Sequence, residues 1–379
     1  MQRRSLWAFL AGIALVLAGC GGGGDDGPPK IIIDSDYNTM SDDGQLGVMA
    51  AQLQAEGKLQ VLGITVVSGN KWLDQGVMEA LKSVERLGMG QRIPVYAGEN
   101  YALSHDWATI EQELAAGAAN DGYYGAWSVS LTAPTPAELV APSDGVATST
   151  RLQAQPAVDF LIDSIKANPG QVTILAIGPL TNIAKAMRKA PEIVPLIQQI
   201  IYMGGAVHVP GNTTKTAEFN WWFDPEAAQY VVRQPVPQVV VPLDVTDTVQ
   251  LTTPIYNRIA HGTRTTAVTE QFKEVMGPGF NGIGFEGDPN YELDVWDTLT
   301  IAYLIDPKYA TEVSEEYVDV VNAPGQANNG QSIGYATQPA GATLQKMKVV
   351  KKFDNARFFE LYIDLHTRPV PITLPASGS

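Results

Sequence analysis

Four carboxylates lie within ten residues, directly after the first strongly apolar stretch of the main body of the chain. They are Asp34, Asp36, Asp42 and Asp43, and the apolar stretch is Ile31–Ile33. Carboxylates this close raise one another's pKa unless a cation neutralises them, and a group of hard oxygen ligands suits Ca²⁺ or Mg²⁺. The pattern therefore predicts a divalent metal site.

Helix capping accounts for only part of this group. Asp42 and Asp43 near a helix start would interact favourably with the helix dipole, but capping does not explain the two carboxylates before them. An EF-hand loop counted from Asp34 requires Gly at its sixth position and Glu at its twelfth, where the chain has Thr39 and Gln45. The EF-hand interpretation therefore fails, and a metal site of another kind is favoured.

The elements that must position these carboxylates predict an α/β domain. Short runs rich in Val and Ile alternate with helical stretches, which is typical of a mostly parallel central sheet with helices on both faces. The expected strands cover residues 30–33, 59–67, 93–96, 172–176, 199–203 and 238–241. The expected helices cover residues 44–54, 73–87, 156–167, 182–189 and 225–232, and residues 346–365 return to the same domain as a strand and a helix. Ligands in such folds bind where strands end, which is where the carboxylates stand.

The composition limits the possible partners. The 379 residues include 25 Lys and Arg against 40 Asp and Glu, giving a formal charge of −15 and a pI near 4.7. This charge repels a phosphate backbone, so nucleic acid is not expected as a partner. With a single Cys, neither an intrachain disulfide nor a thiolate metal centre can form. The chain also lacks G-x-G-x-x-G and G-x-x-x-x-G-K-[ST] motifs, which removes the usual support for dinucleotide or NTP binding.

The N-terminus has the pattern of an export signal. Arg3 and Arg4 precede the apolar stretch Leu6–Leu17, which is short for a permanent span, and the sequence Leu-Ala-Gly-Cys that ends at Cys20 resembles the lipobox of bacterial lipoproteins. We expect Cys20 to be acylated, so that the protein faces the periplasm or cell exterior and touches the membrane only through its lipid; a plain secretory signal is the alternative. The expected organisation is a signal peptide at 1–19, a flexible tether at 20–29 and one catalytic domain at 30–379.

Six sequence blocks together resemble the inosine-uridine-type nucleoside hydrolases, in the order of that family. The usual first block is D-x-D-x-x-x-D-D, whereas here five residues separate Asp36 from Asp42. The blocks span most of residues 30–370, and they are Asp34–Asp43, Val66–Asn70, Gly178–Asn182, Met203–Gly205 with Gly211-Asn212, Ala217–Asn220 with Asp224–Ala228, and Trp296–Leu299. The resemblance implies a single nucleoside-hydrolase-like domain.

The resemblance also implies roles for individual residues. Asp36 is expected to take a proton from the attacking water, and Asp42 to accept a hydrogen bond from the ribose 2′ hydroxyl. Asp34 is expected to orient the loop from behind, and Met203 to pack beneath the sugar. The implied Ca²⁺ ligands are Asp36, Asp43, Asp297 and the carbonyl of Ile177. The residues expected to hold the ribose hydroxyls are Asn70, Asn212, Glu218 and Asn220.

The leaving base is expected to meet an aromatic ring rather than an imidazole. Many members of the family place a His immediately before the distal Asp, and here that position is Trp296. The Trp-Asp pair resembles the purine-preferring branch, in which stacking on the base assists its departure. A purine offers the larger stacking surface. The alternative is that Trp296 belongs to the core, and His105 is a further candidate acid.

The favoured function is Ca²⁺-dependent hydrolysis of ribonucleosides to free base and ribose, with purine nucleosides preferred. The oligomeric state, monomer or homo-oligomer, stays open. One alternative is a lipoprotein that binds nucleosides without hydrolysing them. Another is a phosphatase with Asp34 as nucleophile, although its D-x-D-x-[TV] motif would need Thr or Val where Asn38 stands. These alternatives remain open at the level of sequence.

Overall fold

The computed structural model describes residues 27–119, 122–279 and 282–369. The strands are β1 (Lys30–Ser35), β2 (Gln60–Val66), β3 (Val95–Ala97), β4 (Val172–Ala176), β5 (Ile197–Met203), β6 (Gln238–Val241), β7 (Gln250–Thr252), β8 (Glu292–Asp294), β9 (Ala310–Val320), β10 (Ser332–Tyr335) and β11 (Lys346–Phe353). The helices are α1 (Asp42–Ala55), α2 (Leu73–Arg86), α3 (Trp107–Ala115), α4 (Ala157–Ala167), α5 (Thr181–Lys189), α6 (Phe219–Phe223), α7 (Pro225–Val232), α8 (Leu243–Thr246), α9 (Thr253–Ala260), α10 (Ala267–Met276), α11 (Gly284–Gly287), α12 (Thr298–Ile305) and α13 (Asn355–Thr367). Short 3-10 turns occur at η1 (Gly125–Ser128), η2 (Pro136–Glu138), η3 (Pro191–Leu196) and η4 (Pro307–Tyr309).

A nine-stranded sheet in the order β10-β9-β11-β6-β5-β4-β1-β2-β3 forms the centre of the molecule. The strands from β11 to β3 in this order pair in parallel, and β9 and β10 extend the sheet by antiparallel pairing. A separate antiparallel pair joins β7 to β8. This confirms the mostly parallel α/β sheet, although β9 and β10 were not expected from the sequence.

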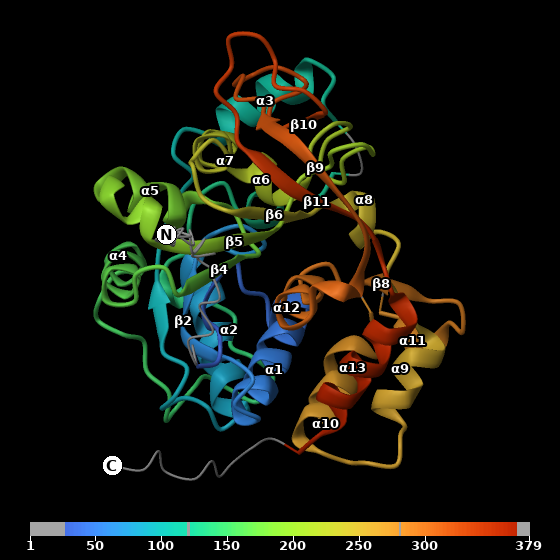
Figure 1. Cartoon of the computed structure of the whole chain (residues 1–379). Helices are drawn as coiled ribbons and strands as arrows, with labels where there is room; N and C mark the ends of the chain where they lie inside the picture. The colour runs from blue at the N-terminus through green and yellow to red at the C-terminus, as the bar shows by residue number, and fades with distance from the viewer. Residues whose placement is uncertain (1–26, 120–121, 280–281, 370–379) are drawn as a thin grey trace, which may run out of the picture.

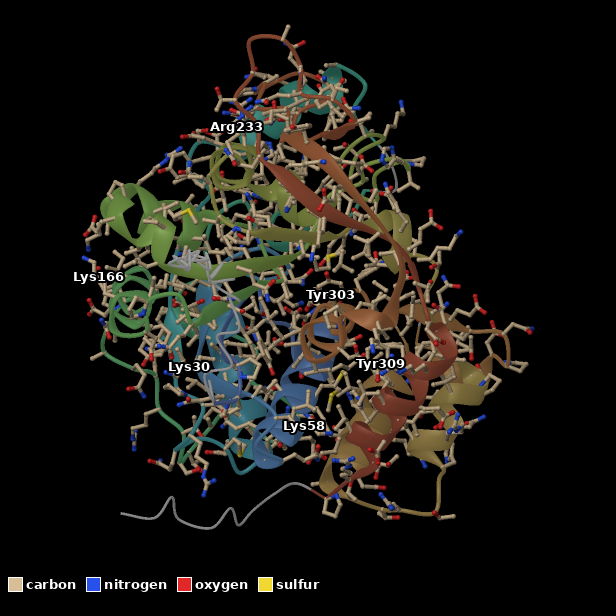
Figure 2. All side chains as sticks on the ribbon, in the orientation of Figure 1. Lys30, Lys58, Lys166, Arg233, Tyr303 and Tyr309 are labelled. Carbon is tan, nitrogen blue, oxygen red and sulfur yellow. The ribbon has the colours of Figure 1, made fainter. Side chains whose placement is uncertain are left out.

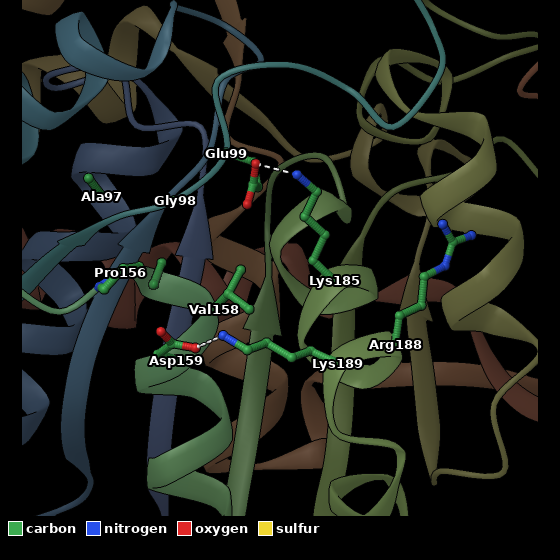
Figure 3. A pocket seen from close by; sticks show the side chains of 10 residues that line it. Ala97, Gly98, Glu99, Pro156, Val158, Asp159, Lys185, Arg188 and Lys189 are labelled. Carbon is green, nitrogen blue, oxygen red and sulfur yellow. Dashed lines mark hydrogen bonds and ion pairs between the residues drawn. The ribbon is translucent and has the colours of Figure 1, made fainter.

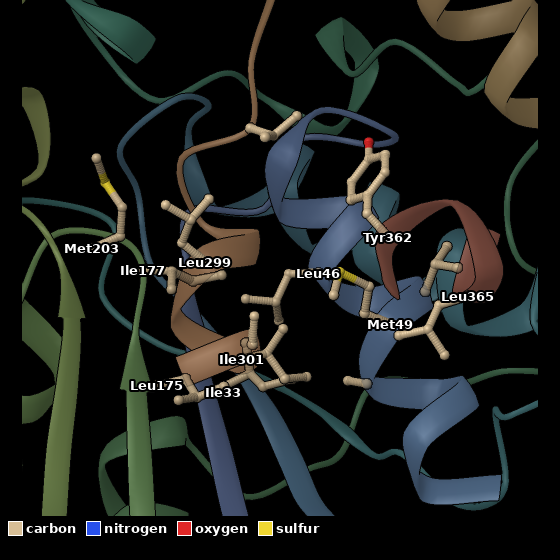
Figure 4. Packing of buried hydrophobic residues seen from close by; sticks show 14 of the residues in the cluster. Ile33, Leu46, Met49, Leu175, Ile177, Met203, Leu299, Ile301, Tyr362 and Leu365 are labelled. Atoms are coloured by element: carbon tan, nitrogen blue, oxygen red, sulfur yellow. The ribbon is translucent and has the colours of Figure 1, made fainter. Parts of the chain in front are cut away.

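The first strand shows why both faces of the sheet are covered. Ile31 and Ile33 pack into one apolar cluster and Ile32 into another, because successive side chains of a strand point to opposite faces. Helices α1, α12 and α13 cover the first face, and α4, α5 and α7 cover the second (Figure 1). Figure 4 shows Leu46 of α1 and Leu299 of α12 over the first face. The predicted helices on both faces are therefore confirmed.

Some predicted boundaries shift for local reasons. The third strand begins at Val95 rather than at residue 93, and Pro94, which has no N–H to give to a ladder, precedes it. The stretch from Pro254 to Glu292 carried little sequence signal, yet it contains most of α9, α10 and α11. Helices α9 and α10 pack against each other and against α13, and α11 lies in the same group of helices (Figure 1).

Some charged side chains lie at the periphery of this fold, as Lys166 and Arg233 illustrate (Figure 2). Within the described residues, no helix combines the length and the apolar character needed to cross a bilayer. The predicted signal peptide at residues 1–19, Cys20 and most of the tether at 20–29 lie outside the described residues.

Candidate active site

The acidic loop runs from the end of β1 to the start of α1. Its extra residues are accommodated by burial, since Tyr37 and Met40 are 1% and 2% exposed. Between them the chain turns through Thr39, whose φ of 33° is in the left-handed region. A Cβ on Gly44 would come within 1.5 Å of the Thr39 carbonyl oxygen, so the turn requires glycine there. The lengthened loop therefore still delivers two acidic residues to the first turn of α1.

Three carboxylates converge from distant parts of the chain. Asp42, Asp43 and Asp297 each offer an oxygen within 4.8 Å of the others. Two oxygens bound to the same Ca²⁺ at about 2.4 Å can be at most about 4.8 Å apart, so the spacing suits one ion. No Lys or Arg in the described part of the chain pairs with any of the three.

The electrostatics of this group also fit a cation. Burial and the charge of Asp43 raise the pKa of Asp42 to about 8. Burial, followed by the charges of Asp42 and Asp43, raises the pKa of Asp297 well above its ordinary value. Burial raises the pKa of Asp43 to about 6, against hydrogen bonds from Ser35 and Ser41. Negative charge is therefore unstable here without an ion, and the residues present fit a divalent cation.

Asp36 lies beside this group, in the field of Asp43 and Asp42. Burial and those charges raise the pKa of Asp36 well above its ordinary value. Its Oδ2 accepts a hydrogen bond from the backbone N–H of Asn70 at 2.6 Å. A Cβ on Gly178 would lie 2.6 Å from the backbone nitrogen of Asp36, so only glycine allows this approach between the ends of β1 and β4. The expected ligand role of Asp36 stays a prediction.

The carbonyl of Ile177 lies at the end of β4, next to Gly178. It accepts a hydrogen bond from Nδ2 of Asn220 at 3.3 Å, and the same amide donates to the carbonyl of Met203 at 3.2 Å. The sulfur of Met203 lies 3.4 Å from that amide. Three residues expected at the site from separate blocks thus meet at neighbouring strand ends, as parallel strands require.

Asn70 joins the acidic group to an aromatic loop. Its Nδ2 donates to Asp43 at 3.2 Å, and its Oδ1 accepts from the hydroxyl of Tyr123 at 2.7 Å. The Tyr123 ring lies 5.2 Å from that of Phe219, centroid to centroid. Several aromatic residues lie between Trp107 and Trp127 in the sequence, and only the folded chain distinguishes Tyr123 from the others.

Glu218 and Asn212 support the start of α6. Glu218 accepts hydrogen bonds from the backbone N–H groups of Gly205 at 2.8 Å and Asn220 at 2.7 Å, and also from that of Trp221. Oδ1 of Asn212 accepts from the N–H of Phe219 at 2.9 Å. Burial raises the pKa of Glu218 to about 7. Both side chains are therefore structural in this state, and their predicted contacts with ribose stay predictions.

Comparison with known proteins decides the family. The sequence model described as inosine-uridine preferring nucleoside hydrolase matches residues 31–360. The chain belongs to this family. It is 34% identical over 295 residues to pyrimidine-specific ribonucleoside hydrolases of Shigella sonnei and Escherichia coli, covering 77% of this chain and 82% of theirs. Hydrolysis of ribonucleosides at the N-ribosyl bond follows from membership.

Solved structures have the same fold. A plant nucleoside hydrolase superposes with a TM-score of 0.70 at 24% identity, covering 90% of this chain and all of that one. A purine-preferring ribonucleoside hydrolase from Gardnerella vaginalis gives a TM-score of 0.69 at 25% identity, covering 89% of this chain and 98% of that one. The single nucleoside-hydrolase-like domain expected from sequence is confirmed, as is the general expectation of a metal-binding hydrolase.

In this nucleoside hydrolase, Trp296 is half-buried immediately before Asp297. It packs against the apolar cluster of α1, α12 and α13, and its Nε1–H donates to Oδ1 of Asp247 at 2.9 Å. Asp247 could not be assigned a role from sequence, because it lies 49 residues away and only the turn after α8 brings it to the indole.

Buried polar residues behind the site hold the strand ends together. Asn182 lies in the first turn of α5, but its side chain does not cap that helix. It donates to Oδ1 of Asp34 at 2.8 Å, and its own Oδ1 accepts from the N–H of Glu99, so it links the ends of β1 and β3. Asp224 caps α7 by accepting a hydrogen bond from the backbone N–H of Ala227 at 3.1 Å.

His105 lies in a separate buried network. Its Nε2 lies 3.0 Å from Oε1 of Glu113, and its Nδ1 lies 3.2 Å from the carbonyl of Phe223. Both ring nitrogens are therefore engaged away from the acidic group. The suggestion that His105 replaces the missing acid has no support in this geometry.

A cavity of about 540 Å³ lies on the α4–α5 face of the enzyme, and it is unrelated to the acidic group (Figure 3). Its cations already have partners, since Lys185 pairs with Glu99 at 2.5 Å and Lys189 pairs with Asp159. Arg188 pairs with Glu226. The cavity therefore offers no unpaired charge to a ligand.

Proposed function

We propose that the protein hydrolyses purine ribonucleosides to free base and ribose with Ca²⁺ as its metal. The observation that carries this proposal is the convergence of Asp42, Asp43 and Asp297 within 4.8 Å, without a basic partner among the described residues. All-oxygen ligands and irregular loop geometry favour Ca²⁺, because Mg²⁺ demands a stricter octahedron and retains more water. The carbonyl of Ile177 and the carboxylate of Asp36 are the further candidate ligands.

Different residues of the chain accept the proton and bind the sugar. A bound Ca²⁺ supplies positive charge that acidifies water and orders hydroxyl groups. Asp36 is the proton acceptor, since its carboxylate is buried beside the acidic group, where the attacking water would be held. Asp42 and Asn70 hold ribose hydroxyls from one side, and Asn220 with Met203 holds the sugar from the other.

The purine preference rests on Trp296. Trp296 immediately precedes Asp297 in the chain and is only half-buried, so its indole is a candidate stacking surface for the base, and stacking favours the larger purine ring. The relatives differ in specificity, since those from S. sonnei and E. coli are named pyrimidine-specific and the one from G. vaginalis purine-preferring. Base preference must therefore be measured directly.

The test is an assay of base release from inosine, guanosine, adenosine and uridine, with Ca²⁺, with Mg²⁺ and with chelator. The proposal expects turnover that chelator abolishes and Ca²⁺ restores, with a higher kcat/KM for the purine nucleosides. Turnover that survives exhaustive chelation would contradict the metal requirement. A higher kcat/KM for uridine would contradict the purine preference.

We further propose that the enzyme is exported and anchored through an acylated Cys20. The supporting feature is the Leu-Ala-Gly-Cys sequence at the end of a short apolar stretch. Labelled palmitate should enter the wild-type protein in a bacterial host, and the Cys20→Ser variant should remain unlabelled. Equal labelling of both proteins would refute the anchor.

A further inference from the structure

The hydrogen bond between Trp296 and Asp247 fixes a carboxylate at the edge of the indole. Nε1–H of Trp296 donates to Oδ1 of Asp247 at 2.9 Å, so the carboxylate lies at the rim of the ring. A base stacked on the indole would therefore present its own edge to this carboxylate. This step rests on the proposed function, in which Trp296 is the stacking surface.

The second oxygen of Asp247 is available to that base. Among the described residues, Asp247 forms no ion pair, and Trp296 is the donor to its side chain. The side chain is exposed at the turn after α8. A charged carboxylate oxygen accepts strongly from N–H donors and repels lone pairs, so it discriminates between amino and oxo groups on a base.

Neighbouring charges strengthen this discrimination. Asp294, at the end of β8, accepts a hydrogen bond from Nε2 of Gln250 at 3.3 Å. Burial and then the charge of Asp247 raise the pKa of Asp294. Burial also raises the pKa of Glu218, and the charge of Asp247 adds to that shift. The edge of the indole therefore carries an acidic group, and neither Asp247 nor Asp294 forms an ion pair within the described part of the chain.

We propose that Asp247 is a specificity residue that selects nucleosides whose base carries an exocyclic amino group. Adenosine is then preferred over purine riboside, which lacks that group, and over inosine, which carries an oxygen in its place. A hydrogen bond from an amino group to a charged carboxylate changes binding by a factor of about ten or more.

The experiment measures kcat/KM for adenosine, inosine and purine riboside with the Ca²⁺-loaded enzyme and with Asp247→Asn. Asparagine keeps an oxygen for the indole N–H, so Trp296 stays in place, but it turns an N–H₂ toward the base. We expect the adenosine-to-inosine ratio and the adenosine-to-purine-riboside ratio each to fall at least tenfold. Asp74→Asn, which removes one exposed charge on α2, is the matched control and should leave both ratios unchanged.

Other outcomes separate this inference from the function on which it rests. Unchanged ratios in Asp247→Asn, with turnover of all three nucleosides, would overturn the inference and leave the proposed function standing. Equal losses on all three substrates would assign Asp247 only to holding Trp296, and would also overturn it. Absence of turnover by the wild-type enzyme on any nucleoside would instead refute the proposed function. Should Asp247→Asn fail to fold, Asp247→Ala at the same exposed position must lower the same two ratios.

Discussion

Replacement of Asp297 by Asn tests whether the acidic group is built for a cation. At an effective dielectric constant of about 20, two charges 4.8 Å apart repel by about 3.5 kcal/mol, and Asp297 faces both Asp42 and Asp43 at no more than this distance. Proton uptake limits the penalty, because keeping one carboxyl protonated at pH 7 costs about 4 kcal/mol relative to the unfolded chain. We therefore expect Asp297→Asn to stabilise the ion-free protein by about 2–4 kcal/mol at pH 7, after allowing for the burial of an amide.

The assay is urea unfolding of the wild type and Asp297→Asn, in chelator and in excess Ca²⁺. In Ca²⁺ at about a hundred times its dissociation constant, the wild type should gain about 2.7 kcal/mol, whereas the variant should gain little. Hydrolysis by the variant should fall by at least a hundredfold. The control Asp74→Asn should behave as wild type in both media. A variant that is less stable than the wild type in chelator, or that gains as much from Ca²⁺, would refute the reasoning.

Three further outcomes follow from contacts around the site. Tyr123→Phe should lower KM about fivefold, because its hydroxyl occupies the Oδ1 of Asn70 that a ribose hydroxyl needs; a higher KM in steady-state assays would contradict this. Tyr362→Phe should cost about 1–2 kcal/mol in urea unfolding and weaken Ca²⁺ binding in calorimetry, because its hydroxyl donates to Gln45, which supports the acidic loop; wild-type Ca²⁺ affinity would argue against that support. Burial lowers the pKa of His366 to about 4, so the folded state binds fewer protons than the unfolded chain and stability should fall as pH drops from about 6.5 towards 4, by about 3 kcal/mol in all. His366→Asn should flatten this part of the unfolding curve, and an unchanged pH dependence would count against it.

The acidic loop shows which features of the site could be predicted from the sequence. Its residue types are enough to predict a cation site, because repulsion among carboxylates in a short segment does not depend on the fold. The accommodation of the five-residue spacer was not predictable, since it depends on Tyr37 and Met40 being buried and on Thr39 adopting a left-handed turn against Gly44.

Asn182 and Asp247 show where local patterns were insufficient. An Asn at a helix start is often a cap, but here its amide is hydrogen-bonded to Asp34 of β1 and to the backbone of Glu99 just after β3. Asp247 has no distinctive neighbours in the sequence, and only the turn after α8 carries it to Trp296. Long-range pairings of this kind involve no sequence period and so leave no local signal.

The sequence by itself determined the alternation of apolar strands and helices, and the clustering of hard oxygen ligands after the first strand, because both follow from residue type and short spacing. The tertiary structure alone decided which carboxylates converge, since Asp297 reaches Asp42 and Asp43 only when α12 packs against α1. It also decided which polar side chains are already engaged, because a hydrogen bond between residues far apart in the chain exists only once the strand ends are aligned.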